Sequence, residues 1–303
     1  MNQPALTILA IPKPFSGHIG IIQRNAITSW AKLLPRPEIY LFGEEEGVTK
    51  LAADLGIHHV DIARSKFGTP MLDDLMRRGR EFAHTPLLAY VNSDIILLQE
   101  CLDAVVKIRE QFSRFLAVAY RANIDLAEPL DFEANGEMKL RREILPSGVS
   151  GEPTAIDVFI FTPDVYENVP SFAIGRGWFD QWLIKEACRQ RIPVVDVSNV
   201  GRAIHQNHDY AHIGASLQAV LSTEEGQRNL ALYGGTPHAF SLLNATHELL
   251  PDSTIRRVHF RRERAAAWNW FWSNFIQPTA GLRAKLGLHR TVKSAAQENG
   301  TKA

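Results

Sequence analysis

Short apolar runs alternate with amphipathic stretches over the first ninety residues of the chain. The runs are rich in β-branched and aromatic residues and are bounded by Pro or Gly, which indicates buried strands. They cover residues 6–11, 38–42, 57–62 and 87–91. The stretches between them repeat apolar residues about one helical turn apart, and Thr69 and Pro70 predict the start of the third helix. This alternation favours a Rossmann-like α/β fold, with a mostly parallel central sheet and helices on both faces.

The second half of the chain continues this pattern less regularly. Apolar runs predict strands over 115–120, 157–161 and 194–197, and a helix is expected over 179–191. The intervening segment 125–153 is polar and rich in Glu, Gly and Pro, which predicts a loop or small excursion. We therefore expect one α/β domain over residues 1–250 and a helical C-terminal extension, with a disordered end, over 251–303.

Composition narrows the class of protein without identifying it. The 303 residues are 45% hydrophobic and carry 33 basic and 33 acidic side chains, so the basic excess expected of a nucleic-acid-binding protein is missing. The two cysteines, Cys101 and Cys188, lie in apolar helical patterns and are expected to be reduced. The N-terminal residues lack the pattern of a secretion signal, and no apolar run is long enough to span a membrane. These features predict a cytoplasmic protein.

A carboxylate follows the fourth apolar run, in the tripeptide Asn92-Ser93-Asp94. Ligands of open parallel sheets bind at the carboxyl ends of the strands. Asp94 is flanked by apolar residues on both sides, and a buried unpaired charge is costly unless a cation is bound to it. The alternative is an Asp that only caps the next turn.

The strands, helices and tripeptide of residues 5–215 resemble the nucleotide-sugar half of GT-A glycosyltransferases, with Asn92-Ser93-Asp94 in the place of that family's Asp-x-Asp. The resemblance implies that Asp94 binds a divalent cation, Mn²⁺ or Mg²⁺, which bridges the two phosphates of a UDP- or GDP-type sugar donor. A hard cation on oxygen ligands suits the charge that develops on a leaving diphosphate. Asn92 and Ser93 would contact the donor, although Asn92 departs from the family's first Asp.

A cluster of histidines follows the run at 194–197. His205 and His208 are accompanied by Asp209, Tyr210 and His212 within eight positions, a density that points to function. GT-A enzymes commonly use a His at this place as a further ligand, which makes His205 and His208 candidate metal ligands. The sequence does not choose between them.

A loop rich in Gly and Trp precedes the helix expected over 179–191, and Asp180 stands at the start of that helix. The resemblance implies that Arg176, Gly177 and Trp178 contact the acceptor and that Asp180 is the general base of an inverting transfer. A carboxylate beside an acceptor hydroxyl can accept its proton as the hydroxyl attacks the anomeric carbon. The alternative is a carboxylate that caps the helix beside two packing tryptophans.

The first strand-to-helix turn carries further candidates for the donor. The family binds its nucleobase and ribose in this region, which implicates Pro12, Lys13, Arg24 and Asn25. Lys13 and Arg24 can also pair with diphosphate oxygens.

Near the C-terminus, five arginines between Arg256 and Arg264 precede an aromatic stripe at helical spacing, namely Trp268, Phe271, Trp272 and Phe275. Such a stripe packs on its own domain or lies on an anionic membrane. A peripheral position at the inner face of the membrane would suit polysaccharide biosynthesis with a glycan or lipid-linked acceptor.

The leading hypothesis is a metal-assisted, inverting glycosyltransferase of the hexosyltransferase type. A metal-dependent hydrolase that uses Asp94, His205, His208 and Asp209 is the second, and a non-catalytic sugar-nucleotide-binding module, favoured by Asn92, is the third.

Overall fold

The computed structural model describes residues 4–208, 217–235 and 239–258. Its first part alternates strands and helices in the expected order. The elements are β1 (Thr7–Ala10), α1 (Gly17–Ala31), β2 (Glu38–Phe42), α2 (Val48–Leu55), β3 (His58–Val60), α3 (Leu72–Phe82) and β4 (Leu88–Val91). The next are β5 (Ile95–Ile96), α4 (Gln99–Gln111), β6 (Leu116–Val118), β7 (Arg121–Ile124), β8 (Val149–Ser150), β9 (Val158–Phe161) and α6 (Phe179–Arg189). The described chain then forms β10 (Val194–Asp196), β11 (Ala203–Gln206), α7 (Leu217–Leu221), α8 (Glu224–Tyr233), β12 (His247–Leu249) and β13 (Ile255–Arg257).

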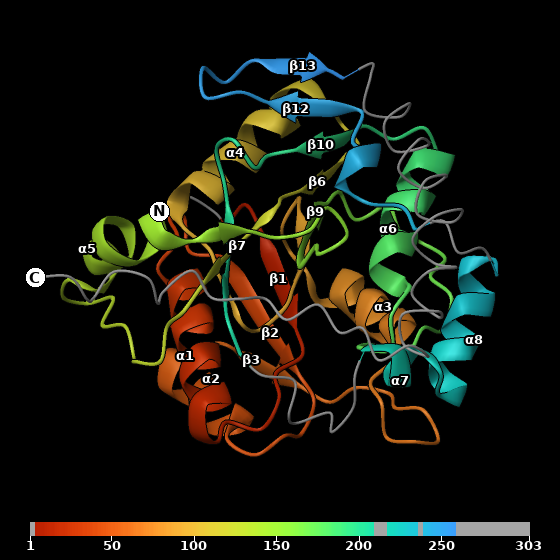
Figure 1. The fold of residues 1–303 in the computed structure, drawn as a ribbon, viewed down its shortest axis with the longest axis horizontal. Coiled ribbons are helices and arrows are strands. Elements are labelled where there is room, and N and C mark those ends of the chain that lie inside the picture. Colours follow the sequence, from red (N-terminus) through yellow and green to blue (C-terminus); the bar gives the residue numbers. More distant parts are fainter. Residues whose placement is uncertain (1–3, 209–216, 236–238, 259–303) are drawn as a thin grey trace, which may run out of the picture.

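A nine-stranded sheet forms the centre, in the order β13-β12-β10-β6-β9-β4-β1-β2-β3 (Figure 1). Its strands run parallel except β9, which lies antiparallel between β4 and β6, and β13, which is antiparallel to β12. The expectation of a mostly parallel central sheet is confirmed. β4 and β6 both end at the same edge, and this edge carries the candidate site.

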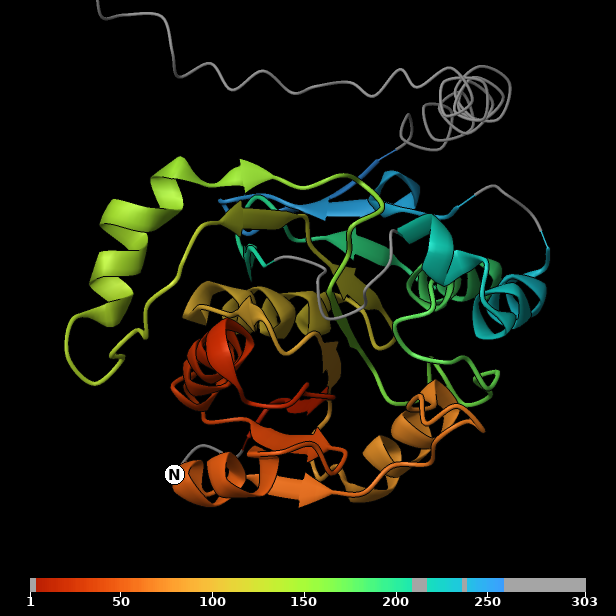
Figure 2. The same ribbon diagram turned by 60° about the horizontal axis from the view of Figure 1, so that its bottom comes forward.

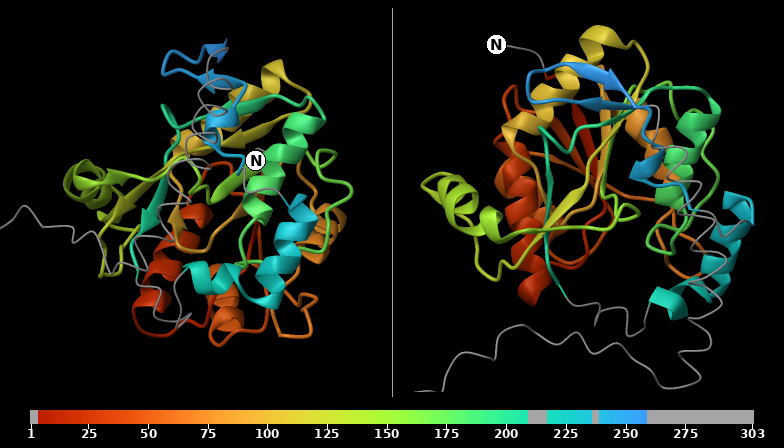
Figure 3. Two further views of the ribbon diagram at one scale, coloured as in Figure 1. Left: turned by 45° about the vertical axis from the view of Figure 1, so that its right-hand side comes forward. Right: turned by 45° about the horizontal axis from the view of Figure 1, so that its top comes forward.

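Helices cover both faces of the sheet, as expected (Figures 1 and 3). On one face α1, α2 and α4 bury residues such as Trp30, Leu51 and Val105. On the other face α3 and α6 bury Leu75 and Leu183, and α8 adds Tyr233. Strand residues alternate between the two cores because successive side chains point to opposite faces: Ile8 belongs to the first core and Leu9 to the second.

A second, four-stranded sheet, in the order β5-β11-β7-β8, lies across the end of the first. The run expected as one strand over 115–120 ends at Val118, and the chain turns into β7 of this second sheet. Ala122 of β7 is buried, and Ile124 joins Ile96 and Ile204 in a third, smaller core. Arg121 and Asn123 therefore lie on the opposite face of β7.

The structure corrects one local prediction and gives detail to another. Helix α3 begins at Leu72, and Thr69 does not cap it, because the Thr69 hydroxyl donates to Glu225 of α8 at 2.8 Å. The segment 125–153, expected as a loop or small excursion, forms such an excursion, with α5 (Gly136–Lys139), a π-helical turn (Leu140–Ile144) and a short 3₁₀ helix (Leu145–Ser147). Figure 2 shows α5 extending away from the main body.

The described chain ends in a hairpin of β12 and β13. The boundary expected at residue 250 falls between these strands, so the central sheet continues to Arg257. The aromatic stripe and the helical extension that was expected to carry it lie outside the described residues. No helix of the described part is long and apolar enough to cross a membrane.

Candidate metal and nucleotide site

Asp94 lies in the turn between β4 and β5, at the carboxyl edge of the central sheet. Its backbone is fixed from two sides. The buried amide of Gln206 donates to the carbonyl oxygen of Asp94 at 3.0 Å, and the Trp30 indole donates to that of Ile95 at 2.8 Å. The carboxylate is thereby held at the sheet edge by contacts from α1 and β11.

Two imidazoles face this carboxylate. Nε2 of His208 lies 3.1 Å from Oδ2 of Asp94, and Nε2 of His205 lies 3.9 Å from the same oxygen. The antiparallel pairing of His205 with Ile95 explains why residues far apart in sequence meet here. The three side chains are only 16%, 8% and 5% exposed for Asp94, His205 and His208.

These three groups fit a divalent cation. Their ligand atoms lie within 4.8 Å of one another. Two ligands at about 2.1 Å from one ion are separated by roughly 3.0 Å in octahedral and 3.4 Å in tetrahedral geometry. Oδ1 of Asp94 is buried without a hydrogen-bond partner among the described residues, which leaves a lone pair for a ligand outside that part of the chain.

The charges around the cluster favour the forms that bind metal. Burial raises the pKa of Asp94, but the His208 hydrogen bond and the charges of His205, His208 and Lys13 outweigh it, and the net pKa is lowered. Burial lowers the pKa of His205 to about 4, against the opposing charge of Asp94. An ionised carboxylate and a neutral imidazole are the forms that coordinate cations.

The other two residues of the tripeptide bind protein groups. Nδ2 of Asn92 donates to Oδ1 of Asp157 at 2.7 Å. Ser93 is buried and donates to the carbonyl oxygen of Ile11 at 3.2 Å and to Gln23 at 3.0 Å. Both side chains thus fix the loops around Asp94, and neither contact supports a direct role in donor binding.

Of the N-terminal candidates, Lys13 has a charge that interacts with Asp94. Its backbone is held by Gln23, which accepts from its N–H at 2.6 Å and donates to its carbonyl oxygen at 2.9 Å. Burial lowers the pKa of the Lys13 ammonium, and the charge of Asp94 opposes that shift.

The remaining N-terminal candidates have other contacts. Pro12 is buried, and the Arg24 guanidinium lies over the Phe15 ring at 5.2 Å. Asn25 is buried and bonded to Gln206, to the carbonyl of Glu128 and to the N–H of Leu130, so its amide joins protein segments. These contacts give no support to donor binding by Asn25.

The loop before α6 has an unusual backbone. Gly175, Gly177 and Trp178 all have positive φ, and Trp178, at φ 71°, is the N-cap of α6. A left-handed conformation in a large non-Gly residue costs on the order of 1–2 kcal/mol, and such strain concentrates at functional sites. Arg176 forms an ion pair with Glu225 at 2.9 Å, and the Trp178 ring lies 5.2 Å from that of Tyr233. Contacts with α8 therefore hold this loop in place.

Asp180 is in the first turn of α6. Burial raises the pKa of its carboxyl to about 7, while the N–H groups of Asp180 and Gln181 oppose the shift. Oδ1 is buried without a partner among the described residues, and Oδ2 accepts from Gln181 at 3.0 Å. Burial raises the pKa of the Tyr90 hydroxyl most, and the charges of Asp157, Asp180 and Asp94 raise it further.

Sequence reasoning missed several residues of the site. Asp157 lies opposite Asn92, and Arg121 and Asn123 share a face of the second sheet with His205. Ten buried side-chain atoms of the described residues lack partners, and six belong to this region, namely those of Asp94, Arg121, Asn123, Asp180, Gln181 and His205. Buried polar atoms are normally bonded, so their concentration here indicates a site for a polar ligand.

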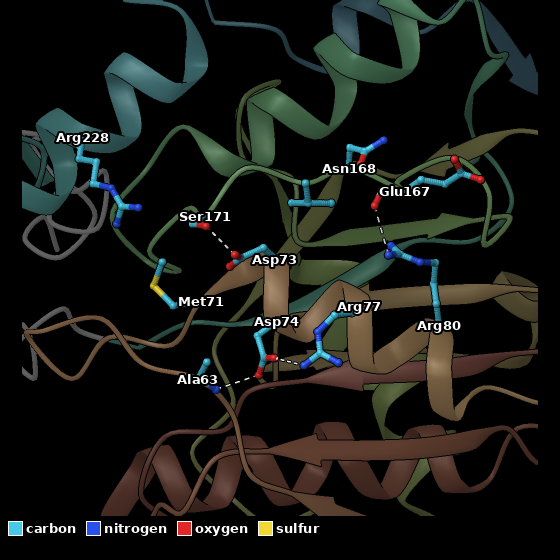
Figure 4. Close-up of a pocket in the computed structure, with 11 residues that line it drawn as sticks. Ala63, Met71, Asp73, Asp74, Arg77, Arg80, Glu167, Asn168, Ser171 and Arg228 are labelled. Atoms are coloured by element: carbon cyan, nitrogen blue, oxygen red, sulfur yellow. Dashed lines mark hydrogen bonds and ion pairs between the residues drawn. The ribbon is translucent and has the colours of Figure 1, made fainter.

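A separate hollow of about 500 Å³ lies along α3 (Figure 4). Its charges largely pair with protein groups: Asp74 binds Arg77 and Arg78, Asp73 accepts from Ser171, and Arg80 donates to the carbonyl oxygens of Tyr166 and Glu167. None of the three candidate cation ligands lines it. Asp209, Tyr210 and His212 of the sequence cluster lie outside the described residues.

No protein-family model matches the chain, and no curated protein sequence matches it. Among solved structures it is similar to glucosyl-3-phosphoglycerate synthase from Mycobacterium tuberculosis. The complex with Mn²⁺, UDP and phosphoglyceric acid has a TM-score of 0.47 and 15% identity, and the match covers 76% of this chain and 79% of that one. The complex with Mg²⁺ and UDP has a TM-score of 0.47 and 14% identity, covering 84% and 87%. At this similarity, the case for function rests on the site residues themselves.

Proposed function

We propose that this chain is a metal-dependent glycosyltransferase that transfers a sugar from a nucleotide-diphosphate donor. The observation that carries the proposal is the cluster of Asp94, His205 and His208, whose carboxylate keeps an unbonded oxygen at the carboxyl edge of a mostly parallel sheet. This edge is where open α/β sheets bind nucleotides. A bound Mn²⁺ or Mg²⁺ would supply positive charge to the leaving diphosphate.

The protein groups have distinct tasks in this reaction. Lys13 is a second positive charge for the diphosphate. Asp180 accepts the proton of the acceptor hydroxyl as the oxygen forms a bond to the anomeric carbon and the bond from that carbon to the diphosphate breaks. A base works best with a pKa near the operating pH, and the pKa of Asp180 is about 7. A base placed in this way supports inversion at the anomeric carbon.

The loop 175–178 is proposed to bind the acceptor. Its strained Trp178 and its two left-handed glycines precede Asp180 directly, which keeps an acceptor on this loop beside the base. A glycan or lipid-linked acceptor remains our prediction, as does a peripheral membrane position. Binding to anionic vesicles that is unchanged in a Trp268, Phe271 and Trp272 to Ala variant would refute the membrane prediction.

One observation also favours a hydrolase. Two imidazoles and one carboxylate with further positions open are a ligand set that activates water in metal hydrolases. Turnover of a phosphate ester or other hydrolysable substrate without a sugar donor would favour that function.

Thermal unfolding with a panel of UDP-, GDP-, CMP- and dTDP-sugars, with and without Mn²⁺, tests the proposal. A ligand that binds only the folded state raises its stability, by about 2.7 kcal/mol at a hundredfold excess over Kd. We expect at least one diphosphate sugar to raise Tm only when Mn²⁺ is present. Absence of any metal-dependent rise across the panel would contradict the proposed function.

A further inference from the structure

Arg121, the first residue of β7, is directed to the same side of the second sheet as His205. β7 and β11 are parallel, with Arg121 opposite Ala203 and Asn123 opposite His205. Since Ala122 is buried and Ile124 lies in the third core, Arg121 and Asn123 share the face on which His205 lies.

The guanidinium is oriented but only partly bonded. Nη1 pairs with Oδ2 of Asp157 at 3.2 Å, and the other oxygen of Asp157 accepts from Asn92 beside Asp94. Nε is buried without a partner, Nη2 makes no hydrogen bond with the described residues, and 21% of the side chain is exposed. Nε and Nη2 form one edge of the guanidinium, the edge that binds carboxylate or phosphate with two parallel hydrogen bonds.

A glycine makes room for this arrangement. A Cβ on Gly151 would lie 2.6 Å from Cγ and 3.2 Å from Nε of Arg121. The N–H of Gly151 donates to the carbonyl oxygen of Arg121 at 2.8 Å, so the two residues are locked together. The chain thus holds an arginine at the site with an unbonded edge, which is costly unless a ligand binds there.

The charges at the site call for a second basic group near the cation. Asp94 interacts with the charge of Lys13 and Asp157 with that of Arg121, so these four described side chains carry no net positive charge that would attract an anion. A divalent cation reverses the balance, and Arg121 then adds to an attractive field for a diphosphate.

We propose that Arg121 binds the diphosphate of the nucleotide-sugar donor, using the guanidinium edge that Asp157 leaves free. This rests on the proposed function and assigns the donor a protein ligand from the second sheet, in addition to Lys13. Asp157 is a positioning residue, because it acts only by holding Arg121 and Asn92.

Calorimetric titration of Arg121→Ala, Arg121→Lys and the wild type tests the assignment. The probes are UDP, CDP, GDP and ADP with Mn²⁺, the monophosphate of the base that binds best, and Mn²⁺ alone. For Arg121→Ala we expect diphosphate affinity to fall at least tenfold and its ratio to monophosphate affinity to fall as well. Mn²⁺ affinity should stay within about threefold, since Arg121 is not a cation ligand. Arg121→Lys should lose less, because it keeps the charge but not the paired donors.

Arg114→Ala is the matched control, since Arg114 forms an exposed ion pair with Asp164 at 2.6 Å and should leave every affinity unchanged. Wild-type diphosphate affinity in Arg121→Ala would overturn the assignment. An equal loss of affinity for Mn²⁺, monophosphate and diphosphate would also overturn it, because such a loss would indicate a structural role for Arg121. If Arg121→Ala does not fold, the ratio of diphosphate to monophosphate affinity in Arg121→Lys tests the assignment instead. If the wild type binds no diphosphate of the panel with Mn²⁺, the proposed function itself fails, and the assignment with it.

Discussion

Two buried carboxylates of this protein, Asp94 and Glu225, have opposite surroundings. Glu225 of α8 accepts hydrogen bonds from Ser65, from Thr69 at 2.8 Å and from Arg176 at 2.9 Å, so both of its oxygens are bonded to the protein. Asp94 has one oxygen beside two imidazoles and another with no partner among the described residues.

The difference separates a carboxylate that is fully bonded within the protein from one with an oxygen that we propose binds a cation. Burial raises the pKa of both groups and their partners lower it again. For Glu225 these partners tie the loop that carries Arg176 to α8, which stabilises the fold. For Asp94 the partners are histidines, which are common metal ligands, and we propose that a cation completes the cluster.

The largest effect is expected from Asp94→Asn. Loss of the carboxylate charge should abolish measurable Mn²⁺ binding and lower sugar transfer by roughly a thousandfold or more, the scale of losing a central electrostatic group. Mn²⁺ binding is measured by electron paramagnetic resonance of the free ion, and sugar transfer is measured by a transfer assay. Glu225→Gln is the matched control and should bind Mn²⁺ like the wild type. Equal Mn²⁺ affinity in the Asp94 variant would remove the distinction between the two carboxylates.

Asp180→Asn should come next, with transfer reduced about 10²- to 10⁴-fold, the usual contribution of a general base. Donor binding, followed by calorimetry with Mn²⁺, should be unchanged because Asp180 is not a cation ligand. A variant with wild-type turnover would contradict its role as base.

The raised pKa of the Asp180 carboxyl also predicts how the stability of the protein changes with pH. The folded-state pKa of Asp180, about 7, lies above its ordinary value near 3.8, so its protonated form is favoured by folding. Its contribution to stability is full below pH 3.8 and is lost as pH rises through 7, by up to about 4 kcal/mol. Asp180→Asn should therefore unfold at a higher temperature than the wild type at pH 8, while wild-type turnover rises with pH through 7. An Asn variant that is less stable at pH 8 would contradict this account.

His205→Ala and His208→Ala sharpen the definition of the cation site. Each should weaken Mn²⁺ binding by about 10- to 100-fold, since two of the three candidate ligands remain in each variant. His84→Ala, in an exposed histidine 3.5 Å from Glu38, is the control and should have no effect. If only one of the two site histidines matters, the other is a hydrogen-bond partner of Asp94 and not a ligand.

Glu225→Gln is expected to have the smallest effect on function. Its effect on the free energy of unfolding is measured by chemical denaturation. Breaking a buried pair costs about 3–5 kcal/mol, and the partial exposure of Arg176 reduces this to about 2 kcal/mol. An unchanged free energy of unfolding would show that the hydroxyls of Ser65 and Thr69 carry the interaction alone.

Local patterns in the sequence predicted the order of strands and helices and the residues at the sheet edge. Apolar runs and helical periodicity depend on neighbours in the chain, which is why β1 to β4 and their helices were found. The Asn-Ser-Asp tripeptide and the two histidines were found as clusters of polar residues after apolar runs, and the structure brings Asp94, His205 and His208 together.

Long-range pairing was beyond these patterns. Asp157 reaches Asn92 only because β9 inserts antiparallel between β4 and β6, and Arg121 reaches Asp157 only because β7 leaves the central sheet. Asn25 shows the converse: it stands beside the expected nucleotide loop, yet its amide bonds to Gln206, 181 positions away. The spacing of residues within a short stretch of sequence does not indicate such contacts.

The most direct test of the account is a crystal of the protein grown with Mn²⁺ and UDP and measured at the manganese absorption edge. We predict an anomalous peak about 2.1–2.3 Å from Oδ of Asp94 and from Nε2 of His205 and His208, with the diphosphate on its open side. A peak elsewhere, or UDP bound away from an Asp94 side chain that has no cation, would contradict the central claim.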